Sequence, residues 1–314
     1  ATKVSKKASV IFIKAFLICM LAVVVIGACA GIGIMKGVID NAPDIDSTSV
    51  IPRGYKSVML DSEGNTMAEL VTAGSNRVWA DIEDIPEHVQ WAFIDIEDER
   101  FYEHNGIDLR GIARAAATAV ATGFKRTEGA STITQQLLKN SVFDFMSEDT
   151  FVEKVERKLQ EQYLALELEK IMSKEEILEA YLNTINLGQN TLGIQAASNR
   201  YFNKDVGELT ISEAAVIAAI TQNPSRYNPI SHPEDNASRR ELVLDSMLRN
   251  GHITQDEYNE ALADDVYERI QVTNESTGTA EVYSYYVDAT IEAVIADLQE
   301  IKGYTSQQAY NLVY

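Results

Sequence analysis

An uncharged apolar run over residues 15–35 constrains the fold of this chain more than any other feature. Its length is close to the ~20 residues that a helix needs to cross a bilayer. The only charged residues before it are Lys3, Lys6, Lys7 and Lys14. Lysines are enriched on the cytoplasmic side of membrane spans. We therefore expect a single-pass membrane protein whose N-terminus is cytoplasmic.

A cleaved signal peptide is the alternative interpretation of the same run. Ala28, Cys29 and Ala30 are small residues of the kind found near cleavage sites, but the run exceeds the ~7–15 residues of a signal-peptide core. We expect an uncleaved anchor, with residues 1–14 as a cytoplasmic tail and residues 15–35 as the transmembrane helix.

Charge separates the anchor from the remainder of the chain. Five of the 27 basic residues and none of the 47 acidic ones lie in residues 1–36, which leaves 22 basic against 47 acidic residues, a net charge of −25. Such an acidic surface argues against general nucleic-acid binding, because phosphate backbones select basic proteins. Both cysteines, Cys19 and Cys29, lie in the apolar run, so the remainder offers no disulfide and no thiol nucleophile.

The remainder divides into a short first region and a long helical one. Residues 36–80 are expected to form a linker and a β-hairpin, with strands at 58–60 and 67–70. In residues 81–265 the apolar residues recur mostly at helical spacing. Residues 266–314 are expected to be a linker. The expected helices lie at 107–122, 153–171, 213–221, 234–250, 255–263 and 288–301.

The first candidate site is the stretch 97–106, in which an apolar segment ends in acids. Glu97 directly follows a segment that includes Ala92, Phe93 and Ile94. A carboxylate at the mouth of an apolar segment is partly desolvated, which raises its pKa and makes it a better general base near neutral pH. The alternative, for this stretch alone, is a helix end with solvated acids.

A second stretch, 129–140, combines three hydroxyls, two glutamines and a lysine. One interpretation is a Ser/Thr cap that opens a helix. The other is an anion site, because the free N–H groups and the dipole at a helix N-terminus favour negative charge. Gln135, Gln136 and Lys139 are spaced to lie near one another on such a helix.

Two further stretches place charges on helices. Arg157 and Glu161 are four residues apart, with Lys158 beside them. They form either a solvated ion pair worth about 0.2–0.5 kcal/mol or a clamp for phosphate. In the stretch 174–183, core packing is the leading interpretation, and Ser173 predicts a capping box at its start.

Together these stretches resemble the peptidoglycan glycosyltransferase family, the polymerase module of class A penicillin-binding proteins. The resemblance covers about residues 85–229, with Ala130 and Asn223 standing where the family frequently has Gly and Ala. The motifs occur in family order: E-D-x-x-F-x-x-H-x-G at 97–106, G-x-S-T-I-T-Q-Q at 129–136, R-K-x-x-E at 157–161 and I-L-E-x-Y-L-N at 177–183.

The resemblance implies a mainly α, lysozyme-like glycosyltransferase domain at 81–265, beside the transmembrane helix and the small hairpin region. It implies that lipid II is polymerised into β-1,4-linked glycan strands. Glu97 would take the proton from the acceptor's 4-hydroxyl, whose oxygen attacks C1 with inversion as undecaprenyl diphosphate leaves. By the same resemblance Glu161 would be the second catalytic acid, which holds either a metal ion or the diphosphate region. The matched substrate-binding residues are Asp98, Arg100, His104, Ser131, Thr132, Gln135, Gln136, Lys139, Arg157, Lys158 and Asn183.

The resemblance also implies cofactors and partners. A divalent cation, Mg or Mn, assists much of the family and no organic cofactor is expected, although this sequence has no separate cluster of metal ligands. The expected partners are lipid II, the growing glycan strand, the membrane and other cell-wall or division proteins. We expect the catalytic domain outside the bacterial cell membrane, and moenomycin as an inhibitor.

Two segments at the margins of the motifs carry further expectations. Residues 281–314 resemble the linker before the penicillin-binding domain of bifunctional members, so 266–314 is predicted to lead toward a transpeptidase domain; its S-x-x-K and K-T-G motifs do not occur here. Phe143 and Phe145 are expected to dock the module on lipid, and core packing is the alternative.

Two other functions stay open. A lysozyme-like hydrolase would share the helical fold and a glutamate, but it needs an acid poised to protonate a sugar leaving group. Its products are fragments of finished glycan, whereas a polymerase makes polymer from lipid II. A non-catalytic membrane scaffold predicts that Glu97→Gln changes no phenotype.

Overall fold

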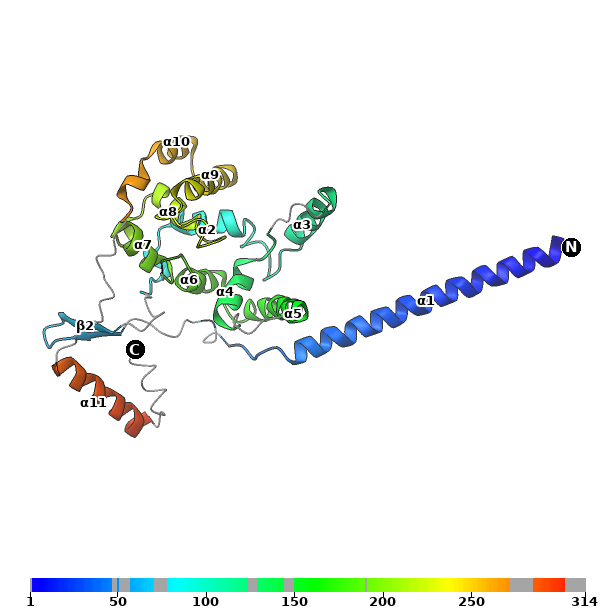
Figure 1. The fold of residues 1–314 in the computed structure, drawn as a ribbon, viewed down its shortest axis with the longest axis horizontal. Coiled ribbons are helices and arrows are strands. Elements are labelled where there is room, and N and C mark those ends of the chain that lie inside the picture. The colour runs from blue at the N-terminus through cyan, green and yellow to red at the C-terminus, as the bar shows by residue number, and fades with distance from the viewer. Residues whose placement is uncertain are drawn as a thin grey trace. The chain divides into compact units, whose positions relative to one another are not determined.

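The computed structural model describes residues 2–46, 50, 57–70, 78–123, 129–143, 150–189, 191–271 and 285–302. These residues are mainly helical and include one two-stranded sheet (Figure 1), so the predicted fold class is confirmed. They fall into two units. The first unit is drawn from 1–44 and 144–164, and the second from 45–143 and 165–314.

The elements in chain order are α1 (Thr2–Asp40), β1 (Ser57–Leu60), β2 (Thr66–Leu70), η1 (Ile82–Asp84), α2 (Glu87–Glu97), α3 (Leu109–Ala121), α4 (Ile133–Ser141), α5 (Phe151–Leu168), α6 (Lys174–Thr184), α7 (Ile194–Phe202), η3 (Val206–Glu208), α8 (Ile211–Ala218), α9 (Pro233–Asn250), α10 (Gln255–Ala263), η4 (Val266–Arg269) and α11 (Tyr285–Lys302).

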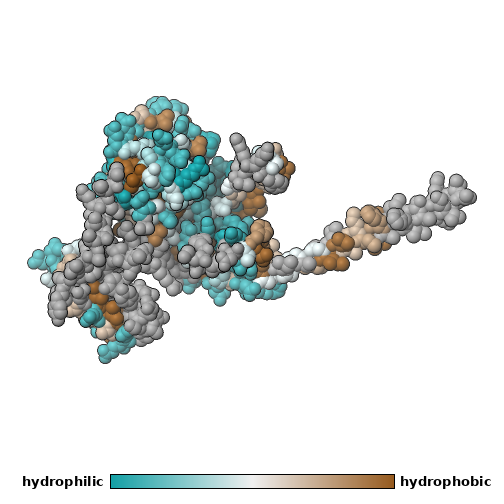
Figure 2. All heavy atoms as spheres, viewed as in Figure 1, coloured by the Kyte–Doolittle hydropathy of each residue, from teal (hydrophilic) through white to brown (hydrophobic). Residues whose placement is uncertain are grey.

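The helix α1 carries the predicted membrane span. By length and composition, its stretch Phe16–Asp40 is the one helix in the described ranges that is long and apolar enough to cross a membrane. Apolar side chains such as Leu21 and Ile26 are exposed on it, and Figure 2 shows hydrophobic residues along its described part. A helix that is apolar all round needs a nonpolar environment to cover it. These properties are those of a single-pass membrane protein.

The predicted hairpin is present. β1 and β2 pair antiparallel, with Ser57 opposite Leu70 and an irregularity in register between Met59 and Leu60. The turn is held by Asp61, whose Oδ1 accepts from the backbone N–H of Glu63 and Asn65, both at 2.8 Å. Asp and Asn side chains commonly bond to nearby backbone in this way, which stabilises turns.

The helix α8 is the centre of the second unit's core. Every residue from Ser212 to Ala218 is buried, as expected for a helix covered on all sides. The helices α2 and α9 pack against α8 and against each other, whereas α4 packs on α6 (Figure 1). α2 contributes Val89, Ala92 and Phe93 to the core. Its last residue, Glu97, therefore lies at the end of a helix that is fixed by packing.

Two helices end earlier than their apolar spacing predicts. The expected helix 153–171 ends at Leu168, because the N–H groups of Lys170 and Ile171 bond to carbonyls only three residues before them, and Ser173 then caps α6. The expected helix 213–221 ends at Ala218 in the same kind of tight turn. The predicted capping box at Ser173 is confirmed. The early end of α8 brings Thr221 to Glu97, as shown below.

Glu213 joins three elements around the core. Its carboxylate is fully buried and accepts from Lys204 Nζ at 2.9 Å and from Arg269 Nε at 3.1 Å. Burial raises the pKa of Glu213, but the hydrogen bonds from the Thr210 backbone and from Lys204 outweigh it, so the net pKa lies below the usual 4.5. The folded state therefore favours the ionised carboxylate.

We expect Glu213→Gln to reduce the free energy of unfolding at pH 7 by about 2 kcal/mol, the scale of a hydrogen bond to a charged group. The lowered pKa means that the carboxylate stabilises the fold above pH 4.5 and loses this effect as the pH falls below that value. Chemical denaturation between pH 7 and pH 3 should therefore show a shallower acid loss in Glu213→Gln than in the parent. The exposed Glu260→Gln is the matched control, and equal slopes for all three proteins would contradict the assignment.

Candidate active site

Glu97 is held by side chains from three other parts of the second unit. Its Oε2 accepts from Gln136 Nε2 on α4 at 2.8 Å, and its Oε1 accepts from Thr221 Oγ1 at 2.5 Å. Arg239 Nη2 on α9 lies 4.0 Å from Oε1. The Glu97 side chain is 14% exposed, so it is partly buried at the end of an apolar helix, as predicted. Two neutral donors fix its orientation and leave acceptor capacity for a ligand.

Asp98 connects the end of α2 to the start of α4. Its side chain is buried, with Oδ1 at 2.9 Å from His104 Nε2 and Oδ2 accepting the backbone N–H of Ile133 at 3.0 Å. Ile133 is the first residue of α4, where N–H groups lack helical partners and a negative charge is favourable. This contact sets α4 beside Glu97 and so places Gln136.

Tyr181 determines which way the Gln136 amide points. Its hydroxyl lies 3.4 Å from Gln136 Oε1, and a phenol O–H donates to that oxygen, so the NH₂ group faces Glu97. Burial raises the pKa of Tyr181 well above its usual 10, and the charges of Glu97 and Asp98 raise it further. Tyr181 therefore stays a neutral donor.

The hydroxyl-rich stretch opens a helix and also secures the preceding loop. Thr132 is the N-cap of α4: its Oγ1 accepts from Gln135 N at 3.2 Å and donates to Gly106 O at 2.8 Å. Gln135 Nε2 donates to the same carbonyl at 3.2 Å. Gly106 has φ +84°, and a Cβ there would lie 2.5 Å from Ala165 O, so only glycine fits. Thr132 and Gln135 are buried and hold this loop in place.

A cavity of about 430 Å³ opens beside Glu97. Ser131 lines it, as do Arg100 and Asp108, which form an ion pair of 2.5 Å. Burial raises the pKa of Asp108, but the hydrogen bonds from Arg100 and the Gly111 backbone, together with the positive charge of Arg100, outweigh it, and the net pKa lies below the usual value. The Arg114 hydrogen bond likewise lowers the pKa of Glu99, another lining residue. The lowered pKa values favour the ionised form of both lining carboxylates, Asp108 and Glu99.

Asn183 has a structural role in the described contacts. It is buried, its Oδ1 accepts from Ala80 N at 2.9 Å, and its Nδ2 donates to Ala80 O at 2.8 Å and to Glu179 O at 2.9 Å. All three of these hydrogen bonds are to backbone groups, which fixes the chain before η1. Its predicted contact with substrate stays a prediction.

The predicted basic cluster lies in the first unit. Glu161 is fully buried, Lys158 Nζ contacts its Oε2 at 2.8 Å, and Arg157 Nη1 contacts its Oε1. The alternative of a solvated pair is therefore wrong for Glu161. Because Glu97 belongs to the second unit, convergence of this cluster with Glu97 stays a prediction of the resemblance.

The remaining expected residues are placed as follows. Lys139 is exposed in the last turn of α4, and Phe143 is partly exposed just after α4. Phe145 lies outside the described residues, so the docking prediction stays untested.

In the described part of the chain, no group of three or more His, Cys, Asp or Glu side chains is placed to hold a metal ion.

Sequence reasoning missed three neighbours of Glu97. Tyr181 lies inside the motif 177–183 but was interpreted as packing. Thr221 follows α8 without any motif of its own. Arg239 is half of an Arg-Arg pair in an acidic region; it lies over the Tyr227 ring at 5.5 Å, and its buried Nε has no hydrogen-bond partner. Of these three residues, only Arg239 had a feature in the sequence, the Arg239-Arg240 pair, that could have indicated a functional role.

Several known proteins are similar to this chain over much of its length. The family model described as Transglycosylase matches residues 63–248. Penicillin-binding protein 1A of Clostridium botulinum (strain Hall) is 37% identical over 320 residues, which cover 99% of this chain and 38% of the relative. Penicillin-binding protein 1F of Bacillus subtilis is 46% identical over 202 residues, 64% of this chain and 27% of the relative.

Among solved structures, penicillin-binding protein 1A from Haemophilus influenzae is 21% identical, with a TM-score of 0.40, and the match covers 78% of this chain and 25% of that one. The chain spans less than half the length of each of these curated relatives.

We expect Asp98→Ala to lower the free energy of unfolding by about 2 kcal/mol, because it leaves the Ile133 N–H and the buried His104 ring without their partner. Chemical denaturation of the full chain in detergent measures this change. Glu103→Ala is the control in the same stretch, since the Glu103 side chain is 62% exposed. An Asp98→Ala variant as stable as the control would show that the contact does not hold α4 in place.

Proposed function

Since this chain belongs to the transglycosylase family, as a peptidoglycan glycosyltransferase module of the class A penicillin-binding protein type, we propose that it polymerises lipid II. The product would be a β-1,4-linked glycan strand, made with inversion at C1. Undecaprenyl diphosphate would be the leaving group. The position of Glu97 is the observation that carries this proposal.

Glu97 suits a general base because its carboxylate is held but not saturated. Gln136 and Thr221 each donate one hydrogen bond to it, whereas a carboxylate accepts about four. The 4-hydroxyl of the acceptor sugar would donate to the remaining capacity. As that oxygen forms its bond to C1, its proton passes to Glu97, and the bonding electrons of C1 leave with the diphosphate. A base must lie within hydrogen-bond reach of the proton that it takes.

The leaving group needs positive charge more than a proton. A diphosphate leaves as an anion, so fixed cations stabilise the charge that develops on it. Lys139, Arg157 and Lys158 are the proposed contacts. Glu161 would act by holding Arg157 and Lys158, since its two oxygens contact both. Because those oxygens are already engaged, the proposed reaction includes no step at a metal ion.

The membrane sets where the reaction takes place. The polyprenyl tail of lipid II stays in the bilayer while its sugars react outside it. We propose that α1 crosses the membrane with its lysine-rich start in the cytoplasm. The transglycosylase region would then lie at the outer face, together with other cell-wall or division proteins.

We expect Glu97→Gln to lower the rate of glycan synthesis from lipid II by about 10² to 10⁴, the typical contribution of a positioned base. The substitution keeps the hydrogen-bonding shape, so the melting temperature should change little. Glu103→Gln, an exposed change in the same stretch, should leave the rate unaltered. Near-parental polymerisation by Glu97→Gln would remove Glu97 from this role, and release of fragments from finished glycan by the parent would favour a hydrolase.

We expect Lys158→Ala to weaken binding of the diphosphate-mimicking inhibitor moenomycin about tenfold, because contacts between charged groups and phosphate are strong. The Lys158 side chain is 40% exposed and Arg157 still contacts Glu161, so the melting temperature should shift by only a few degrees. Lys154→Ala, on the exposed start of the same helix, is the control. A large melting shift with unchanged affinity would make Lys158 a structural residue.

A further inference from the structure

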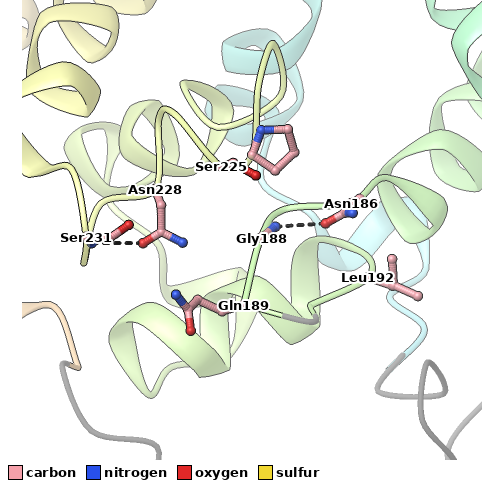
Figure 3. Close-up of a pocket in the computed structure, with 8 residues that line it drawn as sticks. Asn186, Gly188, Gln189, Leu192, Ser225, Asn228 and Ser231 are labelled. Atoms are coloured by element: carbon pink, nitrogen blue, oxygen red, sulfur yellow. Dashed lines mark hydrogen bonds between the residues drawn. The ribbon is translucent and has the colours of Figure 1, made fainter.

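The cations proposed to contact the diphosphate are on α5 and do not line the second cavity of the second unit. That cavity, of about 470 Å³, lies between the loop that joins α6 to α7 and the loop that joins α8 to α9 (Figure 3). None of its lining residues carries a formal charge, whereas a diphosphate needs cations. Arg157 and Lys158 carry such charges on α5. The depth of α5 at the membrane therefore decides whether these cations reach a diphosphate that is attached to a lipid.

The helix α5 is joined directly to the end of α1. Gln160 Nε2 on α5 donates to Val38 O on α1 at 3.0 Å, and both residues belong to the first unit. The Gln160 residue is only 8% exposed. Val38 lies in the last turn of α1, where backbone carbonyls have no N–H partner within the helix. Gln160 thus supplies a hydrogen bond that α1 itself cannot supply.

Packing on α1 begins only after its apolar run has ended. Every described residue from 14 to 37 is exposed, whereas Val38 and Ile39 are half-buried. The first charged residue after the run is Lys36, which pairs with Asp40 at 2.7 Å, and both side chains are largely exposed. Charged side chains are costly inside the hydrocarbon of a bilayer. We therefore expect the contact with α5 to lie just outside the hydrocarbon.

The rise of a helix gives the depth of this contact. Val38 is three residues after Met35, the last residue of the apolar run, so it lies at most about 4.5 Å beyond the hydrocarbon. Each polar layer of a bilayer is about 5–7 Å thick, half the difference between the ~40–45 Å of the whole bilayer and the ~30 Å of its hydrocarbon. The contact thus falls in the layer that holds the phosphates of lipids.

The two cations share one turn of α5 with Gln160. They precede it by three and two residues, which is at most about 4.5 Å along the helix. The next residue, Glu161, is fully buried, and its oxygens contact both Arg157 and Lys158. A hydrogen bond that fixes Gln160 against α1 therefore also fixes the level of both cations.

We propose that Gln160 is a positioning residue, whose bond to Val38 O holds Arg157 and Lys158 at the depth of a diphosphate attached to a membrane-embedded chain. This inference rests on the proposed function, which makes the substrate a lipid diphosphate. Cations at that depth contact the diphosphate without drawing the polyprenyl chain into water or polar groups into hydrocarbon. Both displacements are unfavourable.

Depth is measured directly by spin labelling of the full chain in phospholipid vesicles. Lys154→Cys, on the exposed start of α5, carries the label in a background of Cys19→Ala and Cys29→Ala. Collisions of the label with oxygen and with a water-soluble nickel complex report its depth. Gln160→Met keeps the size of the side chain and removes the donor, so the label should move by a few ångströms or lose a single defined depth.

Gln162→Met is the matched control for this measurement. Gln162 is a half-buried neighbour on α5 whose side chain makes no hydrogen bond within the described residues, so the label should keep the parental depth. The same depth in Gln160→Met as in this control would overturn the proposal. If Gln160→Met does not fold, Gln160→Asn decides, because its amide is one methylene shorter and falls short of Val38 O.

Kinetics with two substrates separate positioning at the membrane from a general structural effect. For lipid II with its full polyprenyl chain in vesicles, Gln160→Met should raise KM about three- to tenfold, the effect of one hydrogen bond, with kcat little changed. A soluble short-chain analogue carries its diphosphate at no fixed depth, so Gln160→Met should use it as the parent does. An equal loss on both substrates would make Gln160 a structural residue and overturn the proposal. A parent that makes no polymer, but whose label depth depends on Gln160, would refute the proposed function and leave the role of the contact in setting depth standing.

Discussion

The arrangement around Glu97 depends on one buried carboxylate, that of Asp98. It accepts the first N–H of α4 and contacts His104, so it ties the end of α2 to the start of α4. Charge-assisted bonds of this kind are stronger than bonds between neutral groups, and the N-terminal end of a helix favours an anion. Without it, Gln136 would lose its fixed place beside Glu97. The neighbouring motif residues Thr132 and Gln135 donate hydrogen bonds to the Gly106 carbonyl. They therefore also connect the start of α4 to the segment that follows α2.

Local features were predictable because they depend on neighbours in sequence. Apolar spacing located most helices, the turn residues 61–65 between two apolar runs located the hairpin, and Ser173 with Glu176 located a capping box. The position of Glu97 at the end of an apolar helix also followed from its neighbours. The ends of α5 and α8 could not be predicted from neighbouring residues. The tight turns that end these helices depend on where the following segment packs in the fold.

Contacts across the fold were not predictable in the same way. Thr221 is 124 residues from Glu97 in sequence, and no local pattern marks it. Arg239 approaches Glu97 only because α9 packs against α2. Asn183 illustrates the opposite case: its motif singled it out, but a motif does not distinguish an amide that binds substrate from one that pairs with Ala80 and Glu179 backbone.

Several cations in the described chain already have an acidic partner. Arg100 contacts Asp108, Arg114 contacts Glu99, and Lys158 contacts Glu161. An anionic ligand at such a residue therefore competes with a protein carboxylate, which weakens binding of a single charge and favours ligands that present several. In an otherwise acidic protein, pairing also prevents these cations from attracting unrelated anions.

The Thr221 hydroxyl has one hydrogen and two acceptors within reach, Glu97 Oε1 at 2.5 Å and Ala218 O at 2.8 Å. It can serve only one of them at a time. When Glu97 is a carboxylate, the Thr221 hydroxyl donates its hydrogen to it. Once Glu97 carries a proton, its own O–H needs an acceptor, and the threonine can rotate its hydrogen to Ala218 and offer its oxygen. Both charge states of the glutamate are thus accommodated by the turn of a single O–H bond, with every heavy atom left in place.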